Sequence, residues 1–418
     1  MNKIFKKILM VSLTGLMFLS GCVTNTCDDC DQPLQLRALS AEEQIVVESA
    51  NNFAFDIFER INQKNDDKNF FISPLSISTA LAMTANGAAD STKTAIHEAI
   101  HLGDLDDEAM NRAYRDLVTF LLGLDKKVIL ELANSNWYKD TYHIKGSFRN
   151  ILLEYYDAEV KAADFFDPAT LGLINGWIED KTHDKIKDML DEIPSDAVMY
   201  LINAIYFKAQ WKYKFDEEKT EERDFNLDEG NKIQVPTMYS KGVKIARYSA
   251  NDFQYIELPY GNGQFNMIIL LPAAGKTVDE VIGGLDAASF AGYVQDADTA
   301  TVEVYMPKFK MKYKTLLNEV LSDMGMGIAF GGGADFSNLF EESLSLEISR
   351  VIHQSFIEVN EEGSEAAAAT IVEIGETSIG PGGDPKVIHI DRPFAFFIAE
   401  KHSKTILFAG KMLNPASE

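Results

Sequence analysis

Apolar residues recur every three or four positions through the first third of the chain, and this spacing predicts helices. Ser40 to Glu43 forms a capping-box start, and apolar positions from Val46 to Ile61 define one face of a first helix. Residues 69–85, NFFISPLSISTALAMTA, predict a short apolar strand, a Ser-Pro break and a buried helix. Further helices are predicted at 91–101, 107–122, 148–155 and 168–190.

From residue 128 onward, short apolar and alternating runs predict strands. Residues 198–211, VMYLINAIYFKAQW, are long, apolar and β-branched, which is typical of a central sheet strand. Asn262-Gly263 suits a hairpin turn within a strand-rich stretch, 223–272. Other strands are predicted at 158–166, 302–312, 344–359, 387–400 and 405–413, and other helices at 278–293 and 315–324. Helices followed by strands, without a clean linker or repeat, predict one large α+β domain over about residues 41–418.

Residues 361–385, EEGSEAAAATIVEIGETSIGPGGDP, carry two patterns at once. Ser364-Glu365 followed by four alanines is typical of a capped helix start. Read at period 2, alternate positions from 364 to 374 are Ser, Ala, Ala, Thr, Val and Ile, which predicts a one-faced strand. Gly-Pro-Gly-Gly at 380–383 then indicates a loop. A segment suited both to an exposed loop and to a buried strand is a candidate moving part.

The chain has 418 residues and a formal charge of −25. This charge argues against binding of nucleic acid or of a sulfated glycan, because both are polyanions that need neutralisation by Lys and Arg. We take the acidity as a contribution to solubility. No organic cofactor is indicated by the sequence.

The N-terminus predicts export. Lys3, Lys6 and Lys7 precede an apolar run, Ile8 to Leu19, that is short for a transmembrane helix. Leu19-Ser20-Gly21-Cys22 resembles a bacterial lipoprotein lipobox, which implies removal of residues 1–21 and lipidation of Cys22. An ordinary signal peptide is the alternative. The expected location is the bacterial cell envelope, lipid-anchored and either periplasmic or surface-exposed.

Residues 22–40 form an acidic tether after the expected cleavage point. Cys27 and Cys30 lie in this tether, and an exported compartment favours a small local disulfide between them. The chain has no cysteine beyond residue 30, so the folded body carries no disulfide and no thiol nucleophile.

His97-Glu98-Ala99-Ile100-His101 matches the H-E-x-x-H pattern of zinc proteases. Asp104 occupies the position where the extended form of that motif has glycine, and no third histidine follows. We interpret the stretch as a surface helix end and expect no metal site, with a zinc protease as a competing hypothesis. The G-x-S-x-G pattern of a serine nucleophile is also missing, so the chain is not expected to be an enzyme.

Several segments resemble the serpin family of protease inhibitors, in the family's order and from about residue 45 to Pro415. They are FFISPLSISTALAM (70–83), NAIYFKAQW (203–211), YMPKF (305–309), IHQSFIEVNEEGSEAAAAT (352–370), PFAFFI (393–398) and LFAGKMLNP (407–415). The resemblance implies a single α+β domain with a large central sheet, further sheets, about eight or nine helices, and an exposed reactive-centre loop over about 363–386.

The implied activity is suicide inhibition of serine or cysteine proteases by a monomer. A target protease cleaves the loop and forms an acyl-enzyme, and the loop then inserts as a new strand between those ending near Trp211 and Glu362. The alternative is a non-inhibitory serpin that acts as a binding or structural protein. Non-inhibitory relatives often carry bulky, charged or proline residues in the hinge, whereas this hinge is small: Glu361, Glu362, Gly363, Ser364, Glu365, Ala366, Ala367, Ala368, Ala369 and Thr370.

Two further sets of residues carry over from the resemblance. One matches the polar cluster beneath the sheet, often called the shutter, that controls strand separation: Ser73, Ser76, Asn203 and His353. The other matches the region where the loop first inserts, often called the breach: Trp211, Lys308 and Glu361. We predict an ion pair between Glu361 and Lys308.

The family's usual spacing from Glu361 places the scissile bond between Thr377 and Ser378. The rest of the loop is longer than in typical relatives, which leaves alternatives at Ile374, Glu376 and Ile379. Residues 365–385 contain no Lys, Arg, Phe, Tyr or Leu, so elastase-like or subtilisin-like proteases are the expected targets, and a Glu-specific protease is the second choice.

Overall fold

The computed structural model describes residues 36–417 apart from 66, 104, 228–229 and 365–385. Nearly all of these residues belong to one unit, Ala38–Glu418. The nine α-helices among them are α1 (Ala41–Lys64), α2 (Pro74–Ala85), α3 (Asp90–Ala99), α4 (Asp107–Leu122), α5 (Gly146–Tyr156), α6 (Pro168–Lys181), α7 (Val278–Ile282), α8 (Ala287–Asp296) and α9 (Asn318–Asp323). The expected capping box begins α1, because the Ser40 hydroxyl accepts from the Glu43 N–H and the Glu43 carboxylate accepts from the Ser40 N–H.

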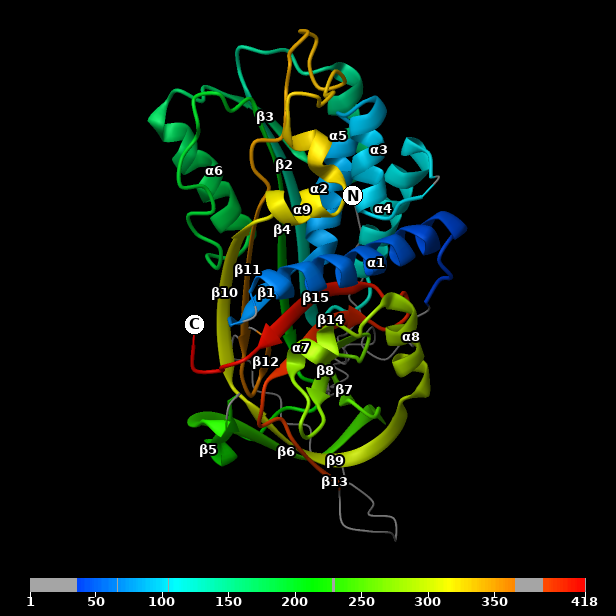
Figure 1. Ribbon diagram of the computed structural model, residues 1–418, viewed down its shortest axis with the longest axis vertical. Coiled ribbons are helices and arrows are strands. Elements are labelled where there is room, and N and C mark those ends of the chain that lie inside the picture. The colour runs from blue at the N-terminus through cyan, green and yellow to red at the C-terminus, as the bar shows by residue number, and fades with distance from the viewer. Residues whose placement is uncertain (1–35, 66, 104, 228–229, 365–385, 418) are drawn as a thin grey trace, which may run out of the picture. The chain divides into compact units, whose positions relative to one another are not determined.

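A six-stranded sheet runs along the unit (Figure 1) in the order β10-β11-β12-β4-β2-β3. Its strands are β2 (Val128–Lys139), β3 (Glu159–Ala163), β4 (Met199–Gln210), β10 (Phe309–Leu316), β11 (Ile352–Val359) and β12 (Gly363–Ser364). β12 has only two residues, yet it lies between two longer strands.

The second sheet has nine strands, in the order β1-β15-β14-β8-β7-β6-β9-β13 with β5 paired to β6. They are β1 (Phe70–Ile72), β5 (Glu221–Asn226), β6 (Lys232–Ser249), β7 (Phe253–Pro259), β8 (Phe265–Pro272), β9 (Asp298–Pro307), β13 (Lys386–His389), β14 (Phe394–Glu400) and β15 (Ile406–Met412). The Asn262-Gly263 turn joins β7 to β8 as predicted, and Gly263 has the positive φ that such a turn requires.

Apolar side chains form a main core and a smaller one. The main core includes α1, α2, both buried strands β14 and β15, and one face of β4 through Ile205 and Phe207. The smaller core lies between α6 and the other face of β4, where Ile202 and Ala204 meet Ile178. The two faces of the six-stranded sheet are therefore both covered in its middle part.

Several predicted elements are shorter or divided in the structure. The strand predicted at 302–312 is two strands in different sheets, because the chain leaves β9 at Pro307 and starts β10 at Phe309. The helix predicted at 278–293 is interrupted at Gly283-Gly284, and the strand predicted at 387–400 is interrupted between His389 and Phe394. Such interruptions follow from Gly and Pro, which the periodic pattern does not register.

Three other predicted boundaries are wrong. The helix predicted at 168–190 ends at Lys181, because His183, Asp184 and Asp188 adopt positive φ. The strand predicted from residue 344 begins at Ile352, and the helix predicted from Thr315 begins at Asn318.

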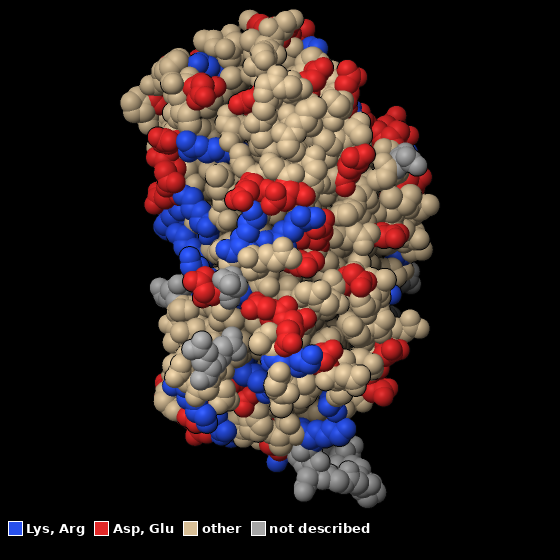
Figure 2. All heavy atoms as spheres, in the orientation of Figure 1, with Lys and Arg blue, Asp and Glu red and all other residues tan. Residues whose placement is uncertain are grey.

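Among the described residues, no helix combines the length and apolar character needed to cross a membrane. Acidic and basic side chains are interspersed over the face shown in Figure 2, so their fields partly cancel there.

Candidate functional site

β12 joins two strands that are otherwise separate. Gly363 lies opposite Gln210 on β4, and Ser364 lies opposite both Ala209 on β4 and Val359 on β11, antiparallel in each case. A β-carbon on Gly363 would approach the Ala209 carbonyl oxygen to 2.0 Å, so only glycine fits this close approach. The hinge predicted from the sequence thus begins as a strand within the sheet.

Ser364 points into the protein at the end of β12. Its side chain is buried, and its hydroxyl lies 2.5 Å from the hydroxyl of Tyr260. The ring of Tyr260 stacks on Trp211 with 4.4 Å between centroids, so a stacked aromatic pair lies against the start of the strand.

A slot continues beyond β12 between β4 and β11. Among the described residues, β4 pairs only with β2 and β12, and β11 pairs only with β10 and β12. A small cavity directly beyond Ser364 is lined by Phe207 of β4 and Phe356 of β11. A larger one, about 410 Å³, lies between the start of β4 and the start of β11. We call the end at β12 the hinge end and the larger cavity the far cavity.

Glu361 is held at the hinge end by two partners. Its carboxylate lies 2.8 Å from the Lys308 ammonium, which is the predicted ion pair, and accepts from the Thr220 hydroxyl at 2.6 Å. Burial alone would raise the pKa of Glu361, but the hydrogen bonds from Lys308 and Thr220 outweigh it and lower the pKa below its ordinary value. Glu361 is therefore ionised at neutral pH, although it is only 6% exposed.

Backbone contacts fix the turn between β11 and β12. The Trp211 indole N–H donates to the Asn360 carbonyl at 2.8 Å, and the Trp211 amide donates to the Glu362 carbonyl at 2.9 Å. Lys214 forms an ion pair with Glu362. Trp211, Lys308 and Glu361 are thus brought together, as the sequence predicted for the breach.

The four predicted shutter residues also meet, beneath the slot. The Ser73 amide donates to His353 Nε2 at 3.1 Å, and the Ser73 hydroxyl donates to the Leu407 carbonyl at 2.8 Å. The Ser76 hydroxyl donates to the Asn203 carbonyl at 3.5 Å. The cluster links β11, the start of α2 and β4, so it bridges both edges of the slot.

Burial lowers the pKa of His353 to about 4, so its imidazole is neutral at pH 7. A neutral ring whose Nε2 accepts from Ser73 carries its proton on Nδ1. Protonation of Nε2 would remove the acceptor and place a charge in a buried cluster, so the cluster requires the neutral form.

The comparisons with known proteins agree on one family. The family model for serpins (serine protease inhibitors) matches residues 48–415. The chain belongs to the serpin family. An uncharacterized serpin-like protein of Thermococcus kodakarensis is 36% identical over 90% of this chain and 87% of its own. Serpin B9 of Homo sapiens is 34% identical over 88% of this chain and 98% of its own.

Solved serpin structures match the fold closely. The native state of the thermophilic serpin tengpin has a TM-score of 0.80, 31% identity, and covers 92% of this chain and 97% of its own. Human thyroxine-binding globulin in a ligand complex has a TM-score of 0.81 and 28% identity, and covers 90% of this chain and 100% of its own. The predicted serpin α+β fold is confirmed. Members of this family typically inhibit proteases, whereas the name thyroxine-binding globulin describes a binding function.

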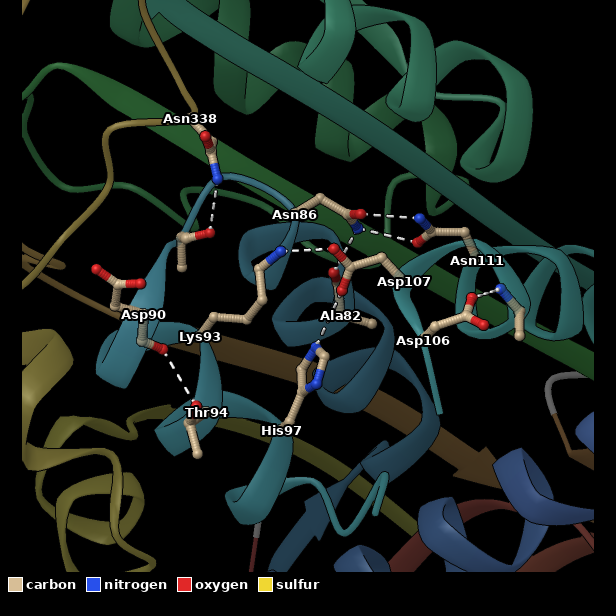
Figure 3. Close-up of polar contacts among 12 residues, drawn as sticks. Ala82, Asn86, Asp90, Lys93, Thr94, His97, Asp106, Asp107, Asn111 and Asn338 are labelled. Carbon is tan, nitrogen blue, oxygen red and sulfur yellow. Dashed lines mark hydrogen bonds and ion pairs between the residues drawn. The ribbon is translucent and has the colours of Figure 1, made fainter. Parts of the chain in front are cut away.

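The H-E-x-x-H residues of this serpin do not face one site. α3 ends at Ala99, and His101 follows it with a positive φ, so the two histidines do not share a helical face. His97 Nε2 lies 3.8 Å from Asp107 on α4, which also pairs with Lys93 (Figure 3). His101 Nε2 lies 3.5 Å from Asp56 on α1. The described residues contain no group of three or more His, Cys, Asp or Glu side chains placed to hold a metal ion.

Part of the predicted serpin site lies outside the described residues. This applies to Glu365 through Thr370 of the hinge, to the bond candidates Ile374, Glu376, Thr377, Ser378 and Ile379, and to Cys22. Their predicted roles stay predictions.

The structure adds residues that the sequence did not indicate. Thr220 and Lys214 hold Glu361 and Glu362, Tyr260 meets Ser364, and Asn134 accepts from the Asn203 amide at 2.6 Å. A signal existed for Asn134, since strands 128–139 and 198–211 both carry an asparagine in their middle. Thr220 lies outside any periodic element, so its position depends on the tertiary fold.

Proposed function

We propose that this serpin is an irreversible suicide inhibitor of serine or cysteine proteases that works by insertion of its cleaved loop into the slot. The observation that carries the proposal is β12, a two-residue strand already paired with both β4 and β11 at the head of the slot, beyond which β4 and β11 have no common partner strand among the described residues. Insertion would extend β12 beyond Ser364 between the same two strands.

The register of β12 specifies how the strand would continue. Since the pairing is antiparallel, each residue after Ser364 moves one position back from Ala209 along β4. Ten further residues reach Met199, where β4 begins, so Ile374 would be the last to find a partner there. Residues 366, 368, 370, 372 and 374 would share the inward face with Ser364, as the alternation in the sequence predicts.

The side chains at the leading part of the strand suit this path. Ala366 and Ala368 would pass the small cavity between Phe207 and Phe356, and Thr370, Val372 and Ile374 would follow as bulkier residues. About a dozen new ladder hydrogen bonds at a net ~1 kcal/mol each give a driving force on the order of 10 kcal/mol.

We propose elastase-like or subtilisin-like proteases as targets, with cleavage between Thr377 and Ser378. The support is the loop composition, which favours pockets for small or β-branched side chains. If cleavage occurs there, the C-terminal fragment begins at Ser378 and would stay bound to the body through β13, β14 and β15 until the protein is denatured.

We also propose that Cys22 carries a lipid that anchors the protein to a bacterial cell envelope, on the strength of Leu19-Ser20-Gly21-Cys22. Radiolabelled palmitate should label the wild-type chain expressed in a bacterium, and Cys22→Ser should abolish the label. Equal labelling of both chains would contradict the proposal.

The test of inhibition is to mix the protein with a panel of elastase-like, subtilisin-like and Glu-specific proteases and separate the products on a denaturing gel. An inhibitory serpin gives a covalent band at the summed mass of protease and inhibitor. The intact mass of the released C-terminal peptide identifies the cleaved bond. Clean loop cleavage without a covalent band, and without a rise in melting temperature, would instead support the non-inhibitory alternative.

A further inference from the structure

The far cavity crosses the six-stranded sheet. Its volume is about 410 Å³, and its two apolar walls belong to different layers of the protein. Ile77 and Leu81 of α2 form one wall and belong to the main core, whereas Ile186 and Leu190, which follow α6, belong to the smaller core. A cavity of this size and lining falls within the range of small-molecule sites.

Two residues that line the far cavity each carry a buried amide oxygen without a hydrogen-bond partner among the described residues. These oxygens are Asn203 Oδ1 on β4 and Gln354 Oε1 on β11. Gln354 is 5% exposed, and its nitrogen already donates to the Lys187 carbonyl at 3.4 Å, so the oxygen is the free group. A buried acceptor without a donor destabilises the protein, and an N–H or O–H group of a ligand that reached it would recover that loss.

The charged side chains around the far cavity disfavour an anionic ligand. The carboxylates of Asp196 and Glu347 line it, and the one guanidinium in its lining, Arg350, is paired with Glu192 at 2.8 Å. An anion there would meet two carboxylates and two carbonyl oxygens, all of them hydrogen-bond acceptors.

We propose that the far cavity binds an uncharged, mainly apolar ring compound with one N–H or O–H donor, and that this compound prevents completion of the inserted strand. The second half of the proposal rests on the strand insertion proposed above. The register places residues 370–374 against residues 203–199 of β4, and these same β4 residues line the far cavity. The compound and the strand therefore compete for one space, so the bound protein would be cleaved as a substrate without trapping the protease.

The test uses the intact full chain and isothermal titration calorimetry with two neutral probes, benzanilide and 4-phenylphenol, and one anionic probe, 2-naphthoate. We expect saturable binding of the neutral probes at one site and binding of 2-naphthoate at least about tenfold weaker.

Gln354→Leu keeps the size of the side chain but removes the acceptor. It should weaken binding of the neutral probes about tenfold, since 1.4 kcal/mol is a factor of ten. Ala80→Trp, which fills the cavity from α2, should abolish binding. Gln63→Leu is the matched control, because Gln63 is exposed on α1 and does not line the cavity.

Failure to detect saturable binding of either neutral probe would overturn the proposal. If Gln354→Leu binds the neutral probes as tightly as the wild type does, the assignment to this cavity is wrong. The same follows if Ala80→Trp keeps the wild-type melting temperature and still binds them. The same titration on loop-cleaved protein tests the competition: lost binding supports it, and retained binding contradicts it. Because the binding assay needs no protease, a protein that binds the probes but traps no protease would contradict only the proposed inhibition.

Discussion

The hinge end and the far cavity lie along the same slot, but they differ in how completely their polar groups and spaces are filled. At the hinge end, Glu361 has two side-chain partners, and the carbonyls of Asn360 and Glu362 in the turn both accept hydrogen bonds from Trp211. The backbone of Gly363 lies too close to Ala209 for any other residue to fit there. The far cavity has a volume of about 410 Å³, and two of its lining residues carry buried amide oxygens that have no partner within the part of the chain that the structure describes.

This difference would give the proposed strand insertion a direction. At the hinge end the backbone partners of a new strand are already in position, so the first residues are fixed without rearrangement. Toward the far cavity, few packed side chains would have to be displaced, since dispersion contacts and hydrogen bonds are incomplete there. A strand that starts at Gly363 would therefore find its backbone hydrogen-bond partners in place at the hinge end. It would have to displace the fewest packed side chains at the far cavity.

The largest expected effect comes from Ser364→Arg. Ser364 is 2% exposed and faces Tyr260, so a guanidinium there would be a buried charge without a partner, and the first residues of the strand would leave the sheet. We expect the variant to be cleaved by the target protease but to form at least tenfold less covalent complex on a denaturing gel. Ser91→Arg, on the exposed start of α3, should trap protease as the wild type does. Equal trapping by both variants would mean that β12 does not direct insertion.

The next largest effect is the pH dependence contributed by His353. Its pKa is about 4 in the folded protein and about 6.5 in an unfolded chain, so the unfolded state binds the extra proton between these values. Stability is therefore full above pH 6.5 and falls as the pH drops toward 4, by about 3 kcal/mol in total. Chemical denaturation at several pH values measures it, and His353→Gln should flatten the slope between pH 6.5 and 4. A variant with the wild-type slope would show that another group carries the proton.

The sequence predicted the hinge end better than the far cavity. Glu361, Lys308 and Trp211 lie in distinctive local motifs. The resemblance of these motifs to the serpin family correctly predicted the Glu361–Lys308 ion pair and the position of Trp211 beside it. The split of 302–312 between two sheets was missed, because the apolar alternation continues on both sides of Pro307. The far cavity was not predicted at all, since it depends on the distance between β4 and β11, and those strands are about 150 residues apart in the sequence.

A smaller effect is expected from the ion pair at the hinge end. Lys308→Met leaves the buried carboxylate of Glu361 with only Thr220, so the folded state should lose on the order of 1–3 kcal/mol. We expect polymerisation to begin at a lower temperature, measured by native gels after heating. Glu361→Gln should act in the same direction, and the double variant should cost less than the sum of the two. Unchanged heat-induced polymerisation in both single variants would contradict a controlling role for the pair.

The smallest predicted effect tests the register itself. Continuation of β12 by one residue places Glu365 directly opposite Lys208 on β4, and among the described residues Lys208 has no ion-pair partner. Such cross-strand pairs contribute about 0.2–1 kcal/mol. Lys208→Glu should therefore slow formation of the covalent complex by about two- to fivefold, through repulsion between the two carboxylates. Glu365→Lys in the same chain should restore the rate, because it re-forms an opposite-charge pair. Lys244→Glu, on β6 of the other sheet, serves as the charge-matched control and should leave the rate unchanged. If Glu365→Lys fails to rescue Lys208→Glu, the strand does not continue from Ser364 in the register that β12 begins.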